Sequence, residues 1–519
     1  MRLRRRGLHT TLADALLEAA ETTPHRTLLV DGDIRLDCVT LHSQSTSLAH
    51  QIAERMPAGS VVSFMLPNWY EAAVVYLAAT QAGMVVNPIL PSLRDRELHF
   101  ILSDAQSRMV FVPGIFGGHD YASMLTRVTA RIDTPPETVV VRGDHAAGHL
   151  SYDLLLAQDP VPGELPTLDP GAIRLILYTS GTAGRAKGVL HSHNSIHALI
   201  GQICEHWSID PGDRFLVPSP IAHIGGSIYA FECPLLLGTT AVLMDRWNAD
   251  TAVTLMRHER ITHMAGATPF LSQLLDAAQH HGTRLPDLEV FICGGASVSP
   301  SLIRGAASYF QRAVVSRVYG STEVPVTTVG ATRPDEAQYA ADTDGRAGIA
   351  DIKLIEHSSA PAGSGEIATR GPQMLIGYLH PQDNTDAFDG DGYFRTGDLG
   401  RWVDDDYLLV TGRAKDIIIR NGENISAKEI EDLLATHPGI AEVAIVGLPD
   451  ERTGERACAV IVSAADPEPD VGALAGFLES SGVARFKLPE QVAVWESLPK
   501  NDAGKVLKHR IRARLIEGT

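Results

Sequence analysis

The chain has 519 residues, 44% of them hydrophobic and 20% charged, and its formal net charge is −18. These values are typical of a globular protein with sizeable cores, and the length predicts roughly three to four domains. The acidic balance argues against a nucleic-acid partner, because proteins that bind nucleic acid present basic surfaces to the phosphates. No stretch reaches the roughly 18 uninterrupted apolar residues of a membrane span, so we expect no stable membrane insertion.

The N-terminus and the cysteines predict the compartment. An arginine-rich cluster at residues 2–6 is not followed by the apolar stretch of an export signal. The five cysteines are odd in number, widely spaced and free of any Cys-x-x-Cys pair. This usage is typical of a reducing environment, so we expect a cytoplasmic protein.

The first part of the chain alternates between apolar strands and helices. Helical spacing covers Leu12–Ala20, and a strand is predicted over Val61–Leu66. A helix then covers Glu71–Gly83, and the next strand is Val85–Pro88. This alternation predicts an open, largely parallel α/β sheet. A further buried strand, Ile173–Leu177, leads directly into the most informative stretch of the chain.

That stretch, residues 178–193, contains glycines, hydroxyls and one lysine between two apolar runs. Glycines let backbone N–H groups approach a ligand, hydroxyls add donors, and a lysine adds positive charge. The pattern predicts a polyphosphate-binding loop, and a flexible surface loop is the alternative. It is not a Walker loop, in which the lysine is followed by Ser or Thr. The candidate residues are Thr179, Ser180, Gly181, Thr182, Gly184 and Lys187.

The alternation continues beyond this loop, and polar segments again follow strands. Gly294–Ser297 and Gly320–Glu323 come directly after two predicted strands. Because ligands of open α/β sheets bind beyond the carboxyl ends of the strands, we expect these segments and the phosphate loop to line one crevice. The predicted elements are helix Ile196–Glu205, strand Phe215–Pro218, a turn-rich segment Ser219–Gly226, strand Ala241–Met244, helix Thr251–His258, and strands Leu288–Cys293 and Val314–Tyr319.

Past Gly345 the pattern changes to short β elements, which predict a small barrel-like subdomain. A tight turn is predicted at Asp398, which glycines flank. The remainder, about a hundred residues long, predicts a compact α+β domain. Its predicted elements are helix Ala427–Thr436, strands Val443–Gly447 and Ala457–Val462, and helix Gly472–Ser480.

Several polar residues in these loops carry candidate chemistry. Glu323 could hold Mg²⁺ together with phosphate oxygens, or could be a surface glutamate. Asp398 could accept ribose hydroxyls, or could be a common turn aspartate. Arg413 could contact phosphate or ribose, or form a surface ion pair. Lys505 could stabilise developing charge, or be one more solvated lysine. His223 could form a wall of the acid pocket, or be a satisfied, partly buried histidine.

Two other kinds of site are disfavoured by the sequence. His191 and His193 are two residues apart and have no Cys or carboxylate partner at a zinc-like spacing. The Gly-x-Ser-x-Gly motif of serine hydrolases is missing from the candidate loops.

Together, these segments resemble the motifs of the adenylate-forming superfamily, which comprises acyl-CoA synthetases, carrier-protein adenylation domains and beetle luciferases. The similarity covers nearly the whole chain, and all five motifs occur in the family's order. The matching segments are residues 179–188 for the phosphate loop, Tyr319–Glu323, Thr396–Asp398 for the ribose, Gly412–Arg413 with Lys415–Asp416 for the hinge, and Lys505 for the catalytic lysine.

The resemblance implies an α/β and α+β architecture. A large N-terminal domain of layered α/β sheets, with a small β-barrel-like subdomain, would span residues 1–411 and hold the ATP and acid sites. Residues 412–416 would form a hinge centred on Lys415. A small, mobile α+β C-terminal domain, residues 417–519, would carry Lys505 and rotate between the two steps of the reaction. A homodimer is a candidate assembly.

The resemblance also implies a reaction in two steps that uses ATP, Mg²⁺ and coenzyme A. A carboxylate attacks the α-phosphorus of ATP and gives acyl-AMP and pyrophosphate; a thiol then displaces AMP. The implied catalytic residues are Lys505, Thr322, Glu323 and His223, with Glu323 as the metal ligand. The implied nucleotide- and CoA-binding residues are Thr179, Ser180, Gly181, Thr182, Gly184, Lys187, Gly295, Ala296, Ser297, Tyr319, Gly320, Ser321, Asp398, Arg413 and Gly422.

The phosphate loop departs from the family pattern at two positions. Ala183 stands where the family usually has a second threonine, and Ala186 stands where it usually has a proline. One hydroxyl donor is lost and the backbone is less restricted, so we expect weaker ATP binding than is typical.

We expect free CoA as the thiol. The alternatives are a free-standing ligase that loads a carrier protein and, in another class, a catalytically idle nucleotide-binding sensor. The residues that line the acid pocket are predicted to be small or apolar, and no Lys, Arg or acidic residue is predicted among them. It therefore favours a monocarboxylic acid that is medium-chain, alicyclic or aromatic, over dicarboxylates and amino acids. The implied pocket residues are His223, Gly225, Gly226, Ala267, Gly294 and Val324.

Overall fold

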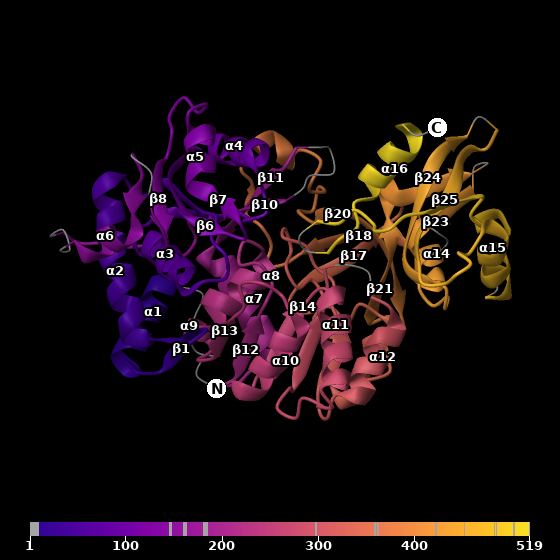
Figure 1. Ribbon diagram of the computed structural model, residues 1–519, viewed down its shortest axis with the longest axis horizontal. Helices are drawn as coiled ribbons and strands as arrows, with labels where there is room; N and C mark the ends of the chain where they lie inside the picture. The colour runs from indigo at the N-terminus through magenta and orange to yellow at the C-terminus, as the bar shows by residue number, and fades with distance from the viewer. Residues whose placement is uncertain are drawn as a thin grey trace.

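A computed structural model describes residues 10–144, 148–158, 163–179, 185–295, 298–357, 360, 363–420, 423–450, 452–481, 483, 485–501 and 504–517. Figure 1 shows a large body built from the first four-fifths of the chain and a smaller body, in orange and yellow, built from the C-terminal part. The large body contains two extensive sheets.

The first sheet has eight strands in the order β19-β11-β10-β4-β3-β5-β8-β9. Its central strands are apolar on both faces, and they pair in parallel, as strands covered by helices on both sides do. The strands are β3 (Val61–Phe64), β4 (Val85–Pro88), β5 (Ser107–Pro113), β8 (Glu137–Val141), β9 (Leu150–Ser151), β10 (Ile173–Thr179), β11 (Lys187–Ser192) and β19 (Gly377–Tyr378).

The second sheet has seven strands in the order β16-β15-β14-β12-β13-β1-β2, and only the edge pair β1–β2 is antiparallel. The carboxyl ends of β12, β14, β15 and β16 therefore meet at one edge of this sheet. The strands are β1 (Thr27–Asp31), β2 (Ile34–Asp37), β12 (Arg214–Val217), β13 (Thr240–Leu243), β14 (His263–Gly266), β15 (Val290–Cys293) and β16 (Val314–Arg317).

A layer of helices lies between the two sheets and shares one hydrophobic core with both. Helix α3 is buried on every side, as its largely apolar sequence predicts, and its polar residues Glu71, Thr80 and Gln81 are buried as well. Helix α1 begins with a reciprocal cap, in which the Thr11 hydroxyl accepts from the Asp14 N–H and the Asp14 carboxylate accepts from the Thr11 N–H. The layer comprises α1 (Leu12–Thr22), α2 (Cys38–Arg55), α3 (Tyr70–Gln81), α6 (Tyr152–Ala157), α7 (His193–His206), α8 (Ile224–Ser227), the π-helix η2 (Ile228–Glu232) and α9 (Cys233–Leu236).

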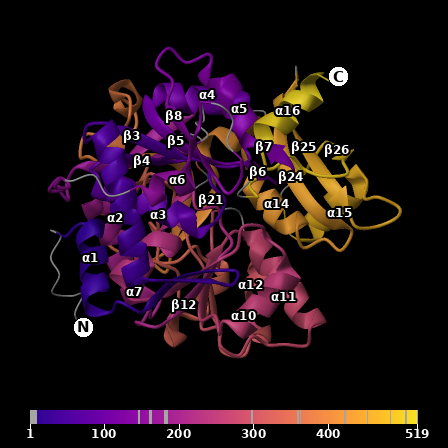
Figure 2. The same ribbon diagram turned by 60° about the vertical axis from the view of Figure 1, so that its left-hand side comes forward.

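Two further groups of helices cover the outer faces of the sheets. Helices α4 and α5 pack on the first sheet, and α10, α11 and α12 pack on the second. Figure 2 shows these two groups on opposite sides of the large body. The bounds are α4 (Asp95–Asp104), α5 (Tyr121–Thr129), α10 (Ala249–His258), α11 (Thr268–His280), α12 (Pro300–Tyr309) and the short α13 (Tyr339–Asp342).

A four-stranded antiparallel sheet, in the order β17-β18-β20-β21, forms the small subdomain. It consists of β17 (Asp351–Ile355), β18 (Gly365–Arg370), β20 (Phe394–Val403) and β21 (Tyr407–Arg413). Short elements elsewhere are β6 (Ile115–Phe116), β7 (His119–Asp120), η3 (Pro334–Glu336), η4 (Pro381–Asn384), η5 (Ala414–Asp416) and η6 (Arg485–Lys487).

The C-terminal body is α+β. Its five-stranded sheet has a core on each face, with α14 and α15 on one side and α16 on the other. Its elements are β22 (Ile417–Arg420), β23 (Glu423–Ser426), α14 (Ala427–Leu434), β24 (Ile440–Asp450), β25 (Gly454–Ser463), α15 (Val471–Ser480), β26 (Gln491–Val494) and α16 (Lys508–Glu517). Within the described ranges, no helix is both long and apolar enough to cross a membrane.

Two local expectations from the sequence were wrong. The segment predicted as turn-rich through Gly226 already contains the start of helix α8, at Ile224. Asp398 lies within strand β20 and not in a tight turn, because Gly397 adopts a φ of +69° and the strand shifts register two residues later. Gly397 thus permits a bulge in strand β20, at a place where the sequence predicted a chain-reversing turn.

Candidate active site

The predicted phosphate loop joins two antiparallel strands of the first sheet. Thr179 closes β10 and pairs with Lys187, the first residue of β11, so the loop is fixed at both ends. A strand–loop–strand arrangement differs from the strand–loop–helix of a Walker site. The candidates Ser180, Gly181, Thr182 and Gly184, and the substituted position Ala183, lie outside the described residues.

Acidic side chains surround the cations at the C-terminal end of this loop. Arg185 pairs with Asp383 at 2.5 Å, and its other guanidinium nitrogen lies 3.8 Å from Asp104. The Lys187 ammonium lies 3.8 Å from Asp383 and 4.8 Å from the ring centroid of Tyr378. Arg185 therefore makes the short contact with Asp383, and Lys187 is held more loosely.

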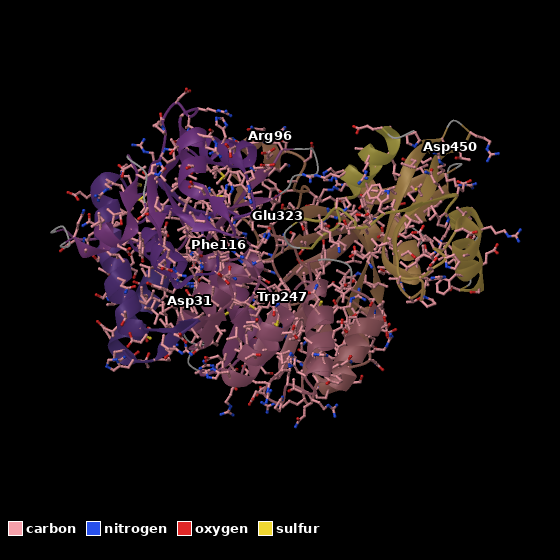
Figure 3. All side chains as sticks on the ribbon, in the orientation of Figure 1. Asp31, Arg96, Phe116, Trp247, Glu323 and Asp450 are labelled. Carbon is pink, nitrogen blue, oxygen red and sulfur yellow. The ribbon has the colours of Figure 1, made fainter. Side chains whose placement is uncertain are left out.

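The Thr322–Glu323 segment is fixed from strands of the other sheet. The Glu323 carboxylate accepts a 3.0 Å hydrogen bond from the Tyr378 hydroxyl. The Thr322 carbonyl lies 2.8 Å from Nε2 of His191, a fully buried histidine on β11. Burial lowers the pKa of His191 to about 4, so at neutral pH the ring is uncharged and donates one N–H to this carbonyl. Figure 3 places Glu323 near the middle of the molecule.

The predicted ribose site forms one connected group. Asp398 on β20 is directly opposite Arg413 on β21, and their side chains pair at 2.9 Å. The Tyr319 hydroxyl donates to the other Asp398 oxygen at 2.7 Å. Burial and the Asp398 carboxylate both raise the pKa of Tyr319, so this hydroxyl remains protonated. The structure thus brings together three residues that the sequence placed in separate motifs.

Lys505 approaches this group from the C-terminal body. It ends a tight hairpin in which Asn501 Oδ1 accepts from the Lys505 N–H at 2.8 Å, and Gly504 has a φ of +77°. Gly504 lies against Pro269 of α11, because an added Cβ would be 3.1 Å from that ring. Burial, followed by the charge of Arg413, lowers the pKa of the Lys505 ammonium to about 8. The negative charge of Asp398, in the predicted ribose site, acts in the opposite direction and raises this pKa.

The glycine-bearing segments behind this site are shaped by packing. At Gly294 an added Cβ would lie 2.9 Å from Val318, and at Gly320 it would lie 2.6 Å from the N atom of Val326. The next residue, Ser321, accepts from the Val324 N–H at 3.2 Å. Gly295 has a φ of +82°, so it also needs its glycine. The candidates Ala296 and Ser297 lie outside the described residues.

The predicted acid-pocket residues lie after neighbouring strands of the second sheet. Ala267 follows β14, and Gly294 follows β15. The Gly294 N–H donates to the carbonyl of Gly266, the last residue of β14, at 3.1 Å. His223 caps the N-terminus of α8 beyond β12. Gly225 faces open space, whereas an added Cβ at Gly226 would be 2.2 Å from the Pro220 carbonyl. Gly226 is therefore required by packing.

The remaining candidates lie at the boundary of the C-terminal body. Lys415 lies in η5, between β21 and β22, and burial followed by Arg413 lowers the pKa of its ammonium. The Ser426 hydroxyl donates to the Thr411 carbonyl across this segment at 2.7 Å. Gly422 lies outside the described residues.

Three residues that contact the candidates were not predicted from the sequence. Tyr378 lies in a strand of two residues and carried no periodic signal. Asp383 lies in a short 3-10 helix that begins at Pro381. His191 was considered only as a metal ligand. Among the described residues, no group of three or more His, Cys, Asp or Glu is arranged to hold a metal ion.

Comparison with known proteins supports the adenylate-forming class that the sequence motifs predict. The family model "AMP-binding enzyme" matches residues 16–379, and "AMP-binding enzyme C-terminal domain" matches residues 429–505. The chain is 33% identical to the medium-chain fatty-acid–CoA ligase of Escherichia coli strain K12, over 99% of this chain and 92% of that one. It is 32% identical to the indoleacetate–CoA ligase of Aromatoleum aromaticum, over 92% and 94% of the two chains.

Solved structures agree with the fold. ATP-bound MatB from Rhodopseudomonas palustris has a TM-score of 0.84 and 25% identity, over 97% of this chain and 99% of that one. Apo MatB from the same organism has a TM-score of 0.74 and 25% identity, over 97% and 98% of the two chains. The structure of this chain is therefore more similar to the ATP-bound structure of MatB than to its apo structure.

Fold and site together define an adenylate-forming enzyme that activates an acid through an acyl-AMP. The chain belongs to the AMP-binding enzyme family and contains both that family's large domain and its C-terminal domain.

Proposed function

We propose that the protein joins a monocarboxylic acid to coenzyme A in two steps at one site. An acid oxygen attacks the α-phosphorus of ATP, the bond to the β-phosphate breaks, and pyrophosphate leaves. The CoA thiol, after losing its proton, then attacks the acyl carbon of the acyl-AMP and expels AMP. The observation that carries this proposal is the approach of the Lys505 hairpin to the large body, where Gly504 lies against Pro269. In this position the charges of Arg413 and Asp398 both act on the pKa of Lys505.

Three side chains would have separate roles in the first step. Lys187, beside the phosphate loop, would bind the departing phosphates, and Asp398 would accept from the ribose hydroxyls. The Lys505 ammonium would neutralise charge that develops between the acid and the nucleotide. Residues 417–519 would then rotate about Lys415, which moves Lys505 away before the thiol enters.

The residues present fit a magnesium ion. Mg²⁺ retains most of its water and commonly takes one or two carboxylates together with phosphate oxygens. Glu323 offers one carboxylate, close to Lys187 through their shared neighbour Tyr378. Bound there, the ion would neutralise triphosphate charge, and Glu323 would hold it.

The acid is proposed to be medium-chain, alicyclic or aromatic. The segments expected to surround it contribute small or apolar residues, including the fully buried Val324. A second carboxylate or an amine on the substrate would need a charged partner, and the predicted set of pocket residues supplies none. The relatives named for a medium-chain fatty acid and for indoleacetate are consistent with this range.

The test is AMP release from ATP with a panel of acids, run with CoA, with a phosphopantetheinylated carrier protein, or without a thiol. We expect release that requires both an apolar monocarboxylate and CoA. Release with the carrier protein but not with CoA would contradict the proposed acceptor. The absence of pyrophosphate exchange with every acid would contradict the proposed first step.

The pKa of Lys505 predicts how the first step depends on pH. The ammonium is the active form, and its pKa of about 8 lies below the ordinary lysine value. The kcat/KM for acyl-AMP formation should therefore be flat below that pH and fall about tenfold per unit above it. Lys505→Arg keeps its charge, so its residual activity should lose this alkaline decline. An identical decline in both proteins, measured by pyrophosphate exchange, would assign it to another group.

A further inference from the structure

Tyr378 occupies the junction between the two large sheets. It belongs to β19, the outermost strand of the first sheet, where it pairs with Val189 of β11. Its backbone N–H also donates to Asn384 at 2.9 Å. Glu323 follows β16, the outermost strand of the second sheet. The Tyr378–Glu323 hydrogen bond therefore connects two sheets whose strands do not pair with each other.

The Tyr378 side chain contacts both charged residues of the candidate metal–triphosphate site. Its hydroxyl donates to Glu323 Oε1 at 3.0 Å, and its ring lies 4.8 Å from the Lys187 ammonium. A cation over an aromatic face is attracted by the ring, most strongly where water is excluded. Tyr378 is only 7% exposed, so its hydroxyl and ring are shielded from solvent, whereas the Lys187 side chain is 27% exposed.

We propose that Tyr378 is a positioning residue for the binding of magnesium-bound ATP. Its hydroxyl fixes the direction of the Glu323 carboxylate, and its ring keeps the Lys187 ammonium beside it. This inference rests on the proposed function, since it takes magnesium and ATP as the ligands.

The direction of the hydrogen bond supports this role. A carboxylate can only accept hydrogen bonds, so the Tyr378 hydroxyl is the donor and Glu323 Oε1 is the acceptor. The bond therefore holds one of the two carboxylate oxygens. With one oxygen fixed, the orientation of the second oxygen, which can ligate a cation, is also defined.

Among the residues that the structure describes, the hydrogen bond to the Glu323 carboxylate comes from Tyr378. The main chain of Glu323 is already held, because its carbonyl accepts from the Leu375 N–H at 2.7 Å. His191 holds the carbonyl of the preceding residue, Thr322. Removing the Tyr378 hydroxyl should therefore release the Glu323 side chain without displacing its backbone.

The position of Lys187 depends on the ring in a comparable way. Its nearest carboxylate, on Asp383, is 3.8 Å away and already makes a 2.5 Å contact with Arg185. Since Arg185 satisfies that carboxylate, the Tyr378 ring is the second contact that locates the Lys187 ammonium. The hydroxyl and the ring thus have separable functions, which two substitutions can distinguish.

The test compares Tyr378→Phe, which keeps the ring, with Tyr378→Leu, which removes both groups. Tyr339→Phe is the matched control, because the Tyr339 hydroxyl also donates to a carboxylate, that of Asp404 at 2.8 Å, but at an exposed site. ATP binding is measured by calorimetry, with Mg²⁺ and with EDTA. The ratio of the two affinities is taken within each protein, so a partly unfolded fraction cancels.

For Tyr378→Phe we expect Mg²⁺-dependent ATP binding to weaken about tenfold, as for the loss of one hydrogen bond to a charged group, with metal-free binding unchanged. Tyr378→Leu should also weaken metal-free binding, by roughly threefold, because the ring contact is lost. Tyr339→Phe should match the wild type in both conditions.

Three outcomes are distinguishable. Equal losses with and without metal in Tyr378→Phe would overturn the inference, because they would indicate a general packing defect. Unchanged binding in Tyr378→Phe would overturn it as well. Failure of the wild type to bind ATP in either condition would instead contradict the proposed function.

Discussion

Replacing Lys505 with alanine should lower the rate of acyl-AMP formation by a factor of about 10²–10³, the usual cost of removing a group that stabilises transition-state charge. The lysine is held at the end of a hairpin that lies against Pro269 of the large body, and the charges of Arg413 and Asp398 act on its pKa. Thioester formation from supplied acyl-AMP should be nearly unaffected, since the proposed rotation removes Lys505 before that step.

The two half-reactions are measured separately, by pyrophosphate exchange and by CoA-dependent consumption of synthetic acyl-AMP. Lys500→Ala is the control, because Lys500 lies in the same hairpin but pairs with Glu442 of its own body at 2.7 Å. Equal losses of both half-reactions in Lys505→Ala would contradict its assigned role. A comparable loss in Lys500→Ala would indicate that the hairpin and not the charge is responsible.

Replacing Glu232 with glutamine should lower the free energy of unfolding by about 3–5 kcal/mol, because it leaves a buried charge without its counter-charge. Glu232, on the π-helix η2, pairs with Arg174 at 2.6 Å, and both side chains are buried. The Tyr76 hydroxyl donates to the same carboxylate oxygen at 2.8 Å and accepts from Arg174 at 2.8 Å. This network connects the strand before the phosphate loop with the helix that follows His223.

Urea unfolding followed by tryptophan fluorescence measures this loss, with all variants compared at one temperature. The double variant Arg174→Met, Glu232→Leu should be less destabilised than Glu232→Gln, since neither charge then remains. The surface control is Glu289→Gln, whose partner Arg312 lies 2.7 Å away and is about half exposed; it should cost at most about 1 kcal/mol. A double variant as unstable as Glu232→Gln would show that packing dominates.

Sequence patterns defined most of the strands that position the site. The runs at Val85–Pro88 and Ile173–Leu177 are mostly apolar, with Asn87 and Arg174 as buried exceptions, because both faces of their sheet are covered by helices. The polar segments after β15 and β16 were located because parallel strands end at one edge. These features are local or repeat along the chain, so they can be recognised from a single sequence.

The parts that were missed depend on contacts distant in the sequence. Helix α11 was not predicted; it begins with Pro269 at its first turn and forms part of the core on the outer face of the second sheet. The position of Asp398 depended on pairing with Arg413, which overrode the turn preference of the neighbouring glycines. Tyr378 became important only through a side-chain contact with Glu323, to which no local pattern refers.

The residues proposed to bind phosphate and those proposed to surround the acid belong largely to different sheets. Thr179, Lys187 and Tyr378 belong to the first sheet, whereas the segments proposed to surround the acid all follow strands of the second. Substitutions after β12, β14 or β15 should therefore change the proposed acid pocket while β10 and β11, which flank the proposed phosphate loop, keep their pairing. Such a scaffold can acquire new acid substrates during evolution, or in a designed library, without changes to the residues proposed to bind ATP.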